Sequence, residues 1–161
     1  MKKIKICGLK RSEDVDYVNT YQPDYVGFVF AGKKRKITYD QAKELKKGLL
    51  SSIQVVGVFV NEDISFVEKL VKNDDSFNVD YDVDYYLFDH GSGGTGESFD
   101  WSMLKEVNKS VFLAGGINLS NIDEALKLNV YGLDVSSGVE TDGFKDREKI
   151  KEIVRRVRNE R

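Results

Sequence analysis

The sequence predicts an α/β fold in which a parallel sheet is covered by helices. Short, nearly continuous apolar runs recur along the chain, and most are followed by a segment with apolar residues at helical spacing. This alternation is typical of parallel sheets, because crossover helices cover the faces of the sheet. The pattern fits either a (β/α) barrel or an open doubly wound sheet. The 161 residues suffice for a hydrophobic core, and we expect a single domain over residues 1–161.

Six segments have the composition of buried strands, rich in Val, Ile, Phe and Tyr. In chain order they cover residues 3–7, 24–30, 53–60, 84–89, 111–116 and 132–138. The stretch before the fourth of them, residues 72–82, is polar and acidic and has no clear period. The sequence therefore predicts about six strand–helix units.

The helices between these strands are predicted from their first residues and their apolar spacing. Thr38 has Gln41 three residues later, the spacing of a capping box, so a helix is expected to begin there. The helix over residues 11–20 has small polar and acidic residues near its start, where they suit exposed N–H groups. The others are expected after Asn61, near 100–108, over 119–128 and over about 145–158.

Composition and charge exclude several classes of function. A formal net charge of −2 offers no general attraction to nucleic acid or to an anionic membrane. No apolar run approaches the roughly 20 residues of a membrane span, and Lys3 and Lys5 interrupt any signal-peptide core at the N-terminus. The single cysteine cannot form an internal disulfide, and we expect a cytoplasmic protein. No G-x-G-x-x-G motif opens the first helix, which argues against a dinucleotide-binding fold.

Small and polar residues gather where the predicted strands end. In parallel α/β folds the carboxyl ends of the strands build the active site, so we expect these residues to lie close together. They are Cys7-Gly8, Arg35, Asn61, Asp89-His90, Gly115-Gly116 and Ser136-Ser137-Gly138.

The first strand carries a candidate reactive side chain, Cys7. Strand alternation places Ile4 and Ile6 on one face and Lys5 and Cys7 on the other, so that Lys5 and Cys7 would face a barrel interior. A lone cysteine is more often a small apolar residue of the core than a reagent, and the residues alone leave both interpretations open. Asp89, at the rim of an apolar interior, would have a raised pKa that suits a general acid.

Glycines at the ends of the last two strands favour an anion site. Backbone N–H groups approach a phosphate closely only where side chains are absent, and these loops of a (β/α) barrel commonly bind phosphate. The residues are Gly115-Gly116 and the Gly138 that follows Ser136-Ser137. Plain turns use the same residue types, so that alternative stays open.

Six segments of the chain carry a family resemblance when they are taken together. They are KIKICGLKRSEDV, DYVGFVFAGKKRKI, VVGVFVNED, FDHGSGGTGESFDW, FLAGGINLSNIDEAL and GLDVSSGVE. In this order they resemble phosphoribosylanthranilate isomerase, a (β/α) barrel enzyme of tryptophan biosynthesis. The resemblance covers roughly residues 2–71 and 84–157 and implies a TIM-barrel-like fold.

The resemblance also implies an activity and roles for the matching residues. The family converts N-(5-phosphoribosyl)anthranilate into an aminoketose by an Amadori rearrangement, with a general acid at the ring oxygen and a general base at C2. Cys7 matches the base, Asp89 matches the acid, and Arg35 matches the arginine that meets the anthranilate carboxylate. A thiolate base needs a pKa lowered by neighbouring positive charge, for which Lys5 is a candidate.

Further positions match the rest of the substrate site. Asp134 falls where sugar hydroxyls would be contacted. The phosphate would be held by Gly115, Gly116, Ser136, Ser137 and Gly138. The resemblance implies no metal and no organic cofactor. The expected partner is a phosphorylated sugar substrate, with no nucleic acid and no membrane.

The middle of the chain departs from the family pattern. Two strands of the usual eight have no counterpart before residue 84, and the family's QLHG motif, whose histidine lines the site, is missing. Six strands cannot close with the geometry of eight, because strand number, tilt and shear are linked. The truncated barrel would close smaller or distort, be completed by a second chain in a homodimer, or be bridged by residues 72–83.

Three functional interpretations follow from this departure. The first is an active isomerase on a shortened barrel. The second is a catalytically impaired remnant that binds a phosphorylated ligand or a partner chain. The third is another sugar-phosphate isomerase of the same barrel class, for which a paired acid and base would serve equally well.

Overall fold

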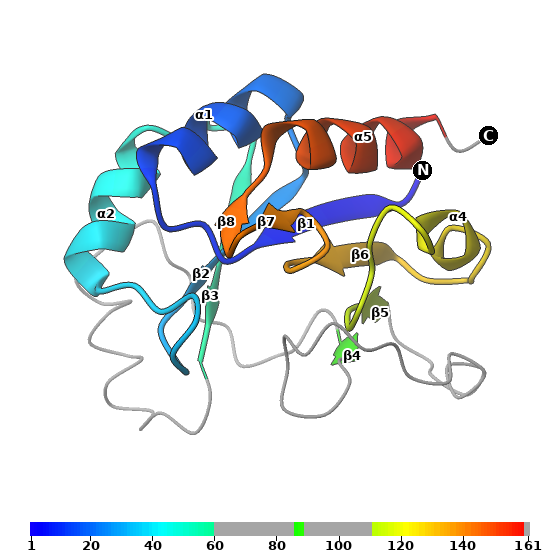
Figure 1. Ribbon diagram of the computed structural model, residues 1–161, viewed down its shortest axis with the longest axis horizontal. Helices are drawn as coiled ribbons and strands as arrows, with labels where there is room; N and C mark the ends of the chain where they lie inside the picture. The colour runs from blue at the N-terminus through cyan, green and yellow to red at the C-terminus, as the bar shows by residue number, and fades with distance from the viewer. Residues whose placement is uncertain (60–85, 89–110, 160–161) are drawn as a thin grey trace.

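Six parallel strands form one sheet in the computed structural model, which describes residues 1–59, 86–88 and 111–159 (Figure 1). The strands are β1 (Lys3–Cys7), β2 (Tyr25–Val29), β3 (Gln54–Val58), β4 (Tyr86–Phe88), β5 (Val111–Leu113) and β6 (Gly132–Val135). Each lies within a segment predicted as a strand, so those six predictions are confirmed. The helices expected after Asn61 and near 100–108, and the acidic stretch 72–83, lie outside the described residues.

The strand order is that of a barrel opened at one place. Across the sheet the order is β3-β2-β1-β6-β5-β4, so consecutive strands are neighbours except where the first strand, β1, pairs with the last, β6. The first and last strands of a (β/α) barrel also meet. A doubly wound sheet of the common nucleotide-binding type would place β1 beside β4 instead. The two ends of the described sheet, β3 and β4, lie on either side of residues 60–85, where two strand–helix units of the family pattern are expected to be missing.

Four helices are present within the described residues. They are α1 (Ser12–Tyr21), α2 (Tyr39–Lys47), α4 (Ile122–Ala125) and α5 (Arg147–Arg158). The capping box of α2 is confirmed: the hydroxyl of Thr38 accepts the N–H of Gln41 at 3.2 Å, and the Gln41 side chain accepts the N–H of Thr38 at 2.9 Å. The helix expected over 119–128 is reduced to the short α4. None of these helices combines the length and apolar character that a membrane crossing needs.

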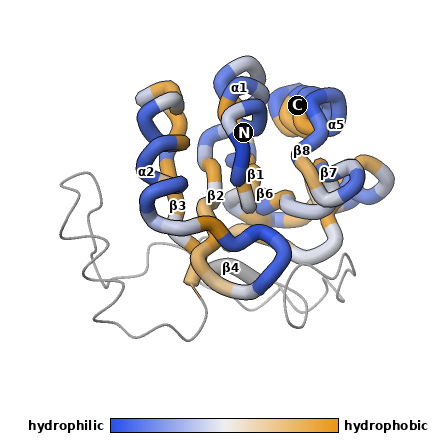
Figure 2. Tube along the Cα trace, turned by 60° about the vertical axis from the view of Figure 1, so that its left-hand side comes forward, coloured by the Kyte–Doolittle hydropathy of each residue, from blue (hydrophilic) through white to orange (hydrophobic). Residues whose placement is uncertain are grey.

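The hydrophobic core lies between the sheet and the helices on one of its faces. Ile4 and Ile6 of β1 are fully buried in the same cluster as Val18 of α1 and as Ile150 and Ile153 of α5. Figure 2 shows α2, α1 and α5 side by side over this face. Lys5 and Cys7 are also buried but are not part of this hydrophobic cluster, as the alternation of side chains along β1 predicts.

A short hairpin between β6 and α5 was not predicted. It pairs β7 (Glu140–Thr141) with β8 (Phe144–Lys145) in antiparallel fashion, with Glu140 opposite Lys145. Asp142 and Gly143 form its turn with φ of 52° and 78°, the positive values that an Asp-Gly hairpin turn requires. The hairpin places two charged side chains at the carboxyl end of the sheet.

Candidate active site

Cys7 is the last residue of β1 and lies at the carboxyl end of the sheet, with 8 % of its surface exposed. Gly27 of β2 is its partner in the strand register. A Cβ on Gly27 would lie 2.7 Å from the Cys7 sulfur, so glycine is needed there for the thiol to keep its place. On the other side, the Ser136 hydroxyl donates a 3.0 Å hydrogen bond to the Cys7 carbonyl. The thiol is therefore held between β2 and the loop after β6.

Lys5 and Asp134 form a buried ion pair beside Cys7. They are direct neighbours in the register of β1 and β6, and Lys5 Nζ donates to Asp134 Oδ2 at 2.7 Å. Their side chains are only 4 % and 7 % exposed. Burial alone would lower the pKa of Lys5, but the negative charge of Asp134 and its hydrogen bond raise it above its usual value, so the ammonium persists. Asp134 Oδ1 is buried and has no hydrogen-bond partner among the described residues.

The pKa of the Cys7 thiol is raised rather than lowered in this structure. Burial is the largest cause, and the negative charge of Asp134 adds to it. Lys5 and Lys145 lower the pKa of Cys7, as the sequence predicted for Lys5, but they do not outweigh burial. Lys5 thus acts in the predicted direction, but the pKa of Cys7 lies above its usual value because burial is the larger influence.

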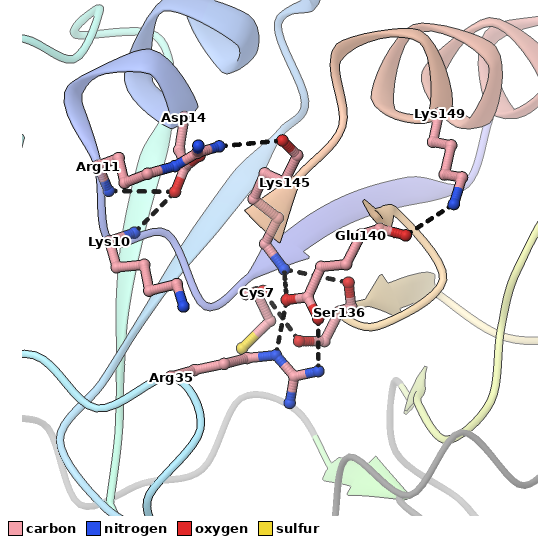
Figure 3. Close-up of polar contacts among 9 residues, drawn as sticks. All are labelled: Cys7, Lys10, Arg11, Asp14, Arg35, Ser136, Glu140, Lys145 and Lys149. Atoms are coloured by element: carbon pink, nitrogen blue, oxygen red, sulfur yellow. Dashed lines mark hydrogen bonds and ion pairs between the residues drawn. The ribbon is translucent and has the colours of Figure 1, made fainter. Parts of the chain in front are cut away.

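Arg35 lies across the end of β1, from the loop between β2 and α2. Gly8 has a φ of +86°, and a Cβ there would lie 2.5 Å from the Arg35 side chain, so glycine is required for this crossing. Arg35 Nε and Nη2 donate to the two carboxylate oxygens of Glu140, each at 2.8 Å. Figure 3 shows the Arg35 side chain beside the sulfur of Cys7 and its guanidinium against Glu140.

Glu140 is shared by two cations. Besides Arg35, Lys145 Nζ donates to Glu140 Oε1 at 2.7 Å and to the Ser136 carbonyl at 3.0 Å. Burial would raise the pKa of Glu140, but the hydrogen bonds and charges of Arg35 and Lys145 lower it to about 2. Burial lowers the pKa of Lys145 below its usual value despite this partner. Sequence reasoning missed both Glu140 and Lys145, although the Asp-Gly turn between them was a readable hairpin signal.

The two loops predicted to bind phosphate lie side by side. Gly115 and Gly116 follow β5 with φ of +85° and +69°, and the chain near Asn118 is bridged to Gly138 after β6. A Cβ on Gly138 would overlap the Ile117 carbonyl, so the close approach of the loops depends on glycine. The Asn118 side chain donates to the Gly116 carbonyl at 2.8 Å and fixes the first loop.

The described structure thus brings together most of the predicted site residues. Cys7, Arg35 and Asp134 surround the carboxyl end of β1, and Ser136-Ser137-Gly138 follows β6 directly. Asp89 follows β4 in the sequence but lies outside the described residues, as does His90. In residues 1–59 and 111–159 no group of three or more His, Cys, Asp or Glu side chains is placed to hold a metal ion. The site therefore offers a buried thiol surrounded by charged side chains that form hydrogen bonds.

The likeness to known proteins covers nearly the whole chain. The family model for N-(5'phosphoribosyl)anthranilate (PRA) isomerase matches residues 4–75 and 69–156. The N-(5'-phosphoribosyl)anthranilate isomerase of Clostridium acetobutylicum is 42% identical over 202 residues, which cover 98% of each chain. That alignment exceeds the 161 residues of this chain by 41 positions, and the family match divides at residues 69–75. The chain is therefore shortened where the sequence analysis placed the missing strands.

Solved structures of the same description share the fold. The phosphoribosyl anthranilate isomerase of Thermus thermophilus superposes with a TM-score of 0.87 at 26% identity, over 99% of this chain and 100% of that one. Another isomerase structure, in complex with reduced 1-(o-carboxyphenylamino)-1-deoxyribulose 5-phosphate, superposes with a TM-score of 0.77 at 24% identity and covers 98% of this chain and 99% of that one. With the family model and a close relative each spanning most of its length, the chain belongs to the N-(5'-phosphoribosyl)anthranilate isomerase family.

Proposed function

We propose that Cys7 and Asp89 act as base and acid in the reaction of this family, the isomerisation of N-(5'-phosphoribosyl)anthranilate in tryptophan biosynthesis. One observation carries the proposal. A buried thiol, an arginine held beside it and a buried carboxylate oxygen without a described partner meet at the carboxyl ends of β1 and β6. In barrel enzymes this end of the sheet holds the active site.

The reaction proceeds by proton transfers and needs no external reductant or oxidant. Asp89, as the acid, donates a proton to the ring oxygen, and the ring opens to a protonated Schiff base at C1. Cys7, as the base, removes the proton from C2, and the electron pair of that C–H bond neutralises the iminium nitrogen. Proton return to C1 of the resulting enolamine and loss of the proton from the C2 hydroxyl complete the aminoketose. General acid–base catalysis of this kind contributes about 10²–10⁴-fold to a rate.

The raised pKa of Cys7 fits a base that becomes active only after the sugar ring opens. Burial and the Asp134 carboxylate raise the pKa of the thiol and so favour its protonated form. The Schiff base formed on ring opening carries a positive charge next to the thiol, which favours the thiolate. A sugar hydroxyl donating to Asp134 Oδ1 would weaken the influence of that carboxylate on Cys7 in the same direction. Lys5 and Lys145 add further positive charge that lowers the pKa of Cys7.

The other predicted residues bind the two ends of the substrate. Arg35 receives the anthranilate carboxylate, because a planar guanidinium matches a carboxylate with two parallel hydrogen bonds. The adjacent loops at Gly115-Gly116 and Ser136-Ser137-Gly138 receive the phosphate, where glycine lets the backbone approach closely. Asp134 receives a sugar hydroxyl at its free oxygen. No step of this scheme needs a metal or an organic cofactor.

Replacement of Cys7 tests the assignment of the base. The conversion of freshly prepared phosphoribosylanthranilate is followed through the loss of its anthranilate fluorescence. We expect Cys7→Ala to lower kcat by about 10²–10⁴-fold or more while the reduced product analogue still binds, because the thiol contacts the C2 proton and not the charged ends of the substrate. Glu152→Gln, a change on the outer surface of α5, is the control that keeps full activity.

Two outcomes would contradict parts of this scheme. Unchanged turnover in Cys7→Ala would remove Cys7 from the mechanism. A folded parent protein that binds the product analogue without any turnover would favour the impaired barrel, because the shortening of the chain would then have removed a group that turnover needs.

The proposal extends to the assembly of the chain. We take residues 1–161 as one domain that works in the cytoplasm, with a homodimer covering the ends of its sheet. Within the described residues β3 and β4 each have one strand neighbour, and exposed sheet edges are sites of association. Light scattering during size-exclusion chromatography is expected to give a mass twice that of the 18.3 kDa chain. A monomer at micromolar concentration would contradict the dimer alone.

A further inference from the structure

We propose that Glu140 is a positioning residue that determines the preference of the site for a carboxylated aromatic substrate. It holds one edge of the Arg35 guanidinium so that the opposite edge presents parallel N–H donors to the carboxylate. The inference rests on the proposed function, in which Arg35 binds that carboxylate. It assigns a role to Glu140, which the proposed function does not use.

The hydrogen bonds of Arg35 define which donors remain. A guanidinium has five N–H donors, one on Nε and two on each terminal nitrogen. Glu140 accepts from Nε and from Nη2, which form the side edge of the group. The described residues accept no further hydrogen bond from Arg35, so both N–H groups of Nη1 and the second one of Nη2 are left. Figure 3 shows the remaining terminal nitrogen pointing away from Glu140.

The remaining donors form the end edge of the guanidinium. Nη1 and Nη2 together offer two parallel N–H groups, the arrangement that binds a carboxylate through both of its oxygens. Because Glu140 fixes the plane of the guanidinium, it also fixes the plane in which a second carboxylate binds. A carboxylate on an aromatic ring is stiff, so this constraint orients the ring relative to Cys7.

Lys145 gives the cluster of Arg35 and Glu140 a net positive charge. Arg35 and Glu140 alone would form a neutral pair, and the Glu140 carboxylate would repel an incoming anion. The Lys145 ammonium, whose side chain is 1 % exposed, binds the same Glu140 oxygen at 2.7 Å. Two cations and one carboxylate leave a net charge of one positive unit beside Cys7. That surplus suits a ligand carboxylate.

The hairpin that carries Glu140 is braced from several elements. The Glu140 carbonyl accepts from Lys149 Nζ at 2.7 Å, which ties it to α5. The Lys145 carbonyl accepts from Arg11 Nη2 at 3.1 Å, and Arg11 is itself paired with the fully buried Asp14 at the start of α1. Figure 3 shows this chain of contacts from α1 to Arg35. Positioning of a catalytic-site cation needs such a rigid support.

The test compares two ligands in one set of variants. The first is the reduced product analogue, 1-(o-carboxyphenylamino)-1-deoxyribulose 5-phosphate in reduced form, and the second is the same compound without the ring carboxylate. Inhibition constants for both give the preference for the carboxylate, and kcat and KM are measured for the substrate. Glu140→Gln keeps the shape of the side chain, and Glu152→Gln removes a glutamate from an exposed ion-pair cluster on α5 as the matched control.

We expect Glu140→Gln to reduce the preference for the carboxylated ligand by about tenfold, the loss for one displaced charge-assisted contact. KM should rise by a similar factor while kcat changes less than twofold. Removal of the Glu140 charge makes the cluster more positive, which by itself would favour a carboxylated ligand. The loss therefore reports the orientation of Arg35. Glu140→Asp, which restores the charge on a shorter side chain, should give an intermediate value, and Glu152→Gln should match the parent.

Arg35→Ala separates this inference from the proposed function. Loss of the preference in Arg35→Ala, with no further loss in Arg35→Ala/Glu140→Gln, supports both. If Arg35→Ala loses the preference and Glu140→Gln keeps it, the positioning role is wrong and the proposed function stands. If Arg35→Ala keeps the preference, the assignment of Arg35 fails first. Equal weakening of both ligands in Glu140→Gln and Glu140→Asp would mean a purely structural role and would overturn the inference.

Discussion

Two buried ion clusters lie beside Cys7, and they differ in what they leave unpaired. Lys5 and Asp134 balance in charge, but Asp134 Oδ1 has no partner among the described residues. Glu140 is bound on both oxygens by Arg35 and Lys145, but some N–H donors of Arg35 have no acceptor in the part of the chain that the structure describes. The first cluster offers an acceptor for a hydroxyl, and the second offers donors and surplus charge for an anion. A substrate with hydroxyls at one end and a carboxylate at the other would be oriented by that difference.

The largest effect on stability is expected when one partner of the Lys5–Asp134 ion pair is removed. Lys5→Met leaves the Asp134 carboxylate buried without a counter-ion, so the free energy of unfolding should fall by about 3–5 kcal/mol. The double variant Lys5→Met/Asp134→Leu removes both charges and should recover most of that loss. Urea unfolding at pH 7 measures both values. Equal losses in the single and double variants would show that the pair is not the source of the effect.

A smaller effect on stability is expected when Glu140 is protonated at low pH. The pKa of Glu140 is lowered to about 2 by Arg35 and Lys145, against an ordinary value of 4.5. A lowered pKa stabilises the fold above the unfolded-state value, and this stabilisation is lost as the pH falls from about 4.5 toward 2. The difference in unfolding free energy between the parent and Glu140→Gln should shrink by about 3 kcal/mol over that range. A constant difference would contradict the shared ion pair.

The smallest effect is expected at Asp134 Oδ1, the carboxylate oxygen without a partner among the described residues. Asp134→Asn keeps an acceptor atom but removes the charge, so kcat/KM should fall by roughly tenfold to a hundredfold, the value of a hydrogen bond to a charged acceptor. The same change removes a cause of the raised pKa of Cys7, so that pKa should fall. The pH dependence of iodoacetamide alkylation measures the thiol. A Cys7 pKa that stays the same or rises would show that Asp134 does not act on it.

Local patterns explain what could be predicted from the sequence. The capping box at Thr38 and Gln41 and the alternation along β1 depend on residues within one element, and both are present. The pairing of Lys5 with Asp134 joins residues 129 positions apart through a strand register that no local pattern encodes. The burial that raises the pKa of Cys7 is a property of the assembled sheet. Strands of two residues, as in β7 and β8, are too short for alternation to reveal.

The meeting of β1 and β6 also brings the ends of the chain together. The guanidinium of Arg158, at the end of α5, lies 3.9 Å from the sulfur of Met1, and the N–H of Lys3 donates to the Tyr131 carbonyl at 3.0 Å. Figure 1 shows the N-terminus beside the end of α5. A circular permutant with joined ends and new termini between β3 and β4 would read β4, β5, β6, β1, β2, β3 along the chain, the same order as across the sheet. Its β1–β6 pairing would become local, and folding rates rise when contacts between distant positions are replaced by local ones.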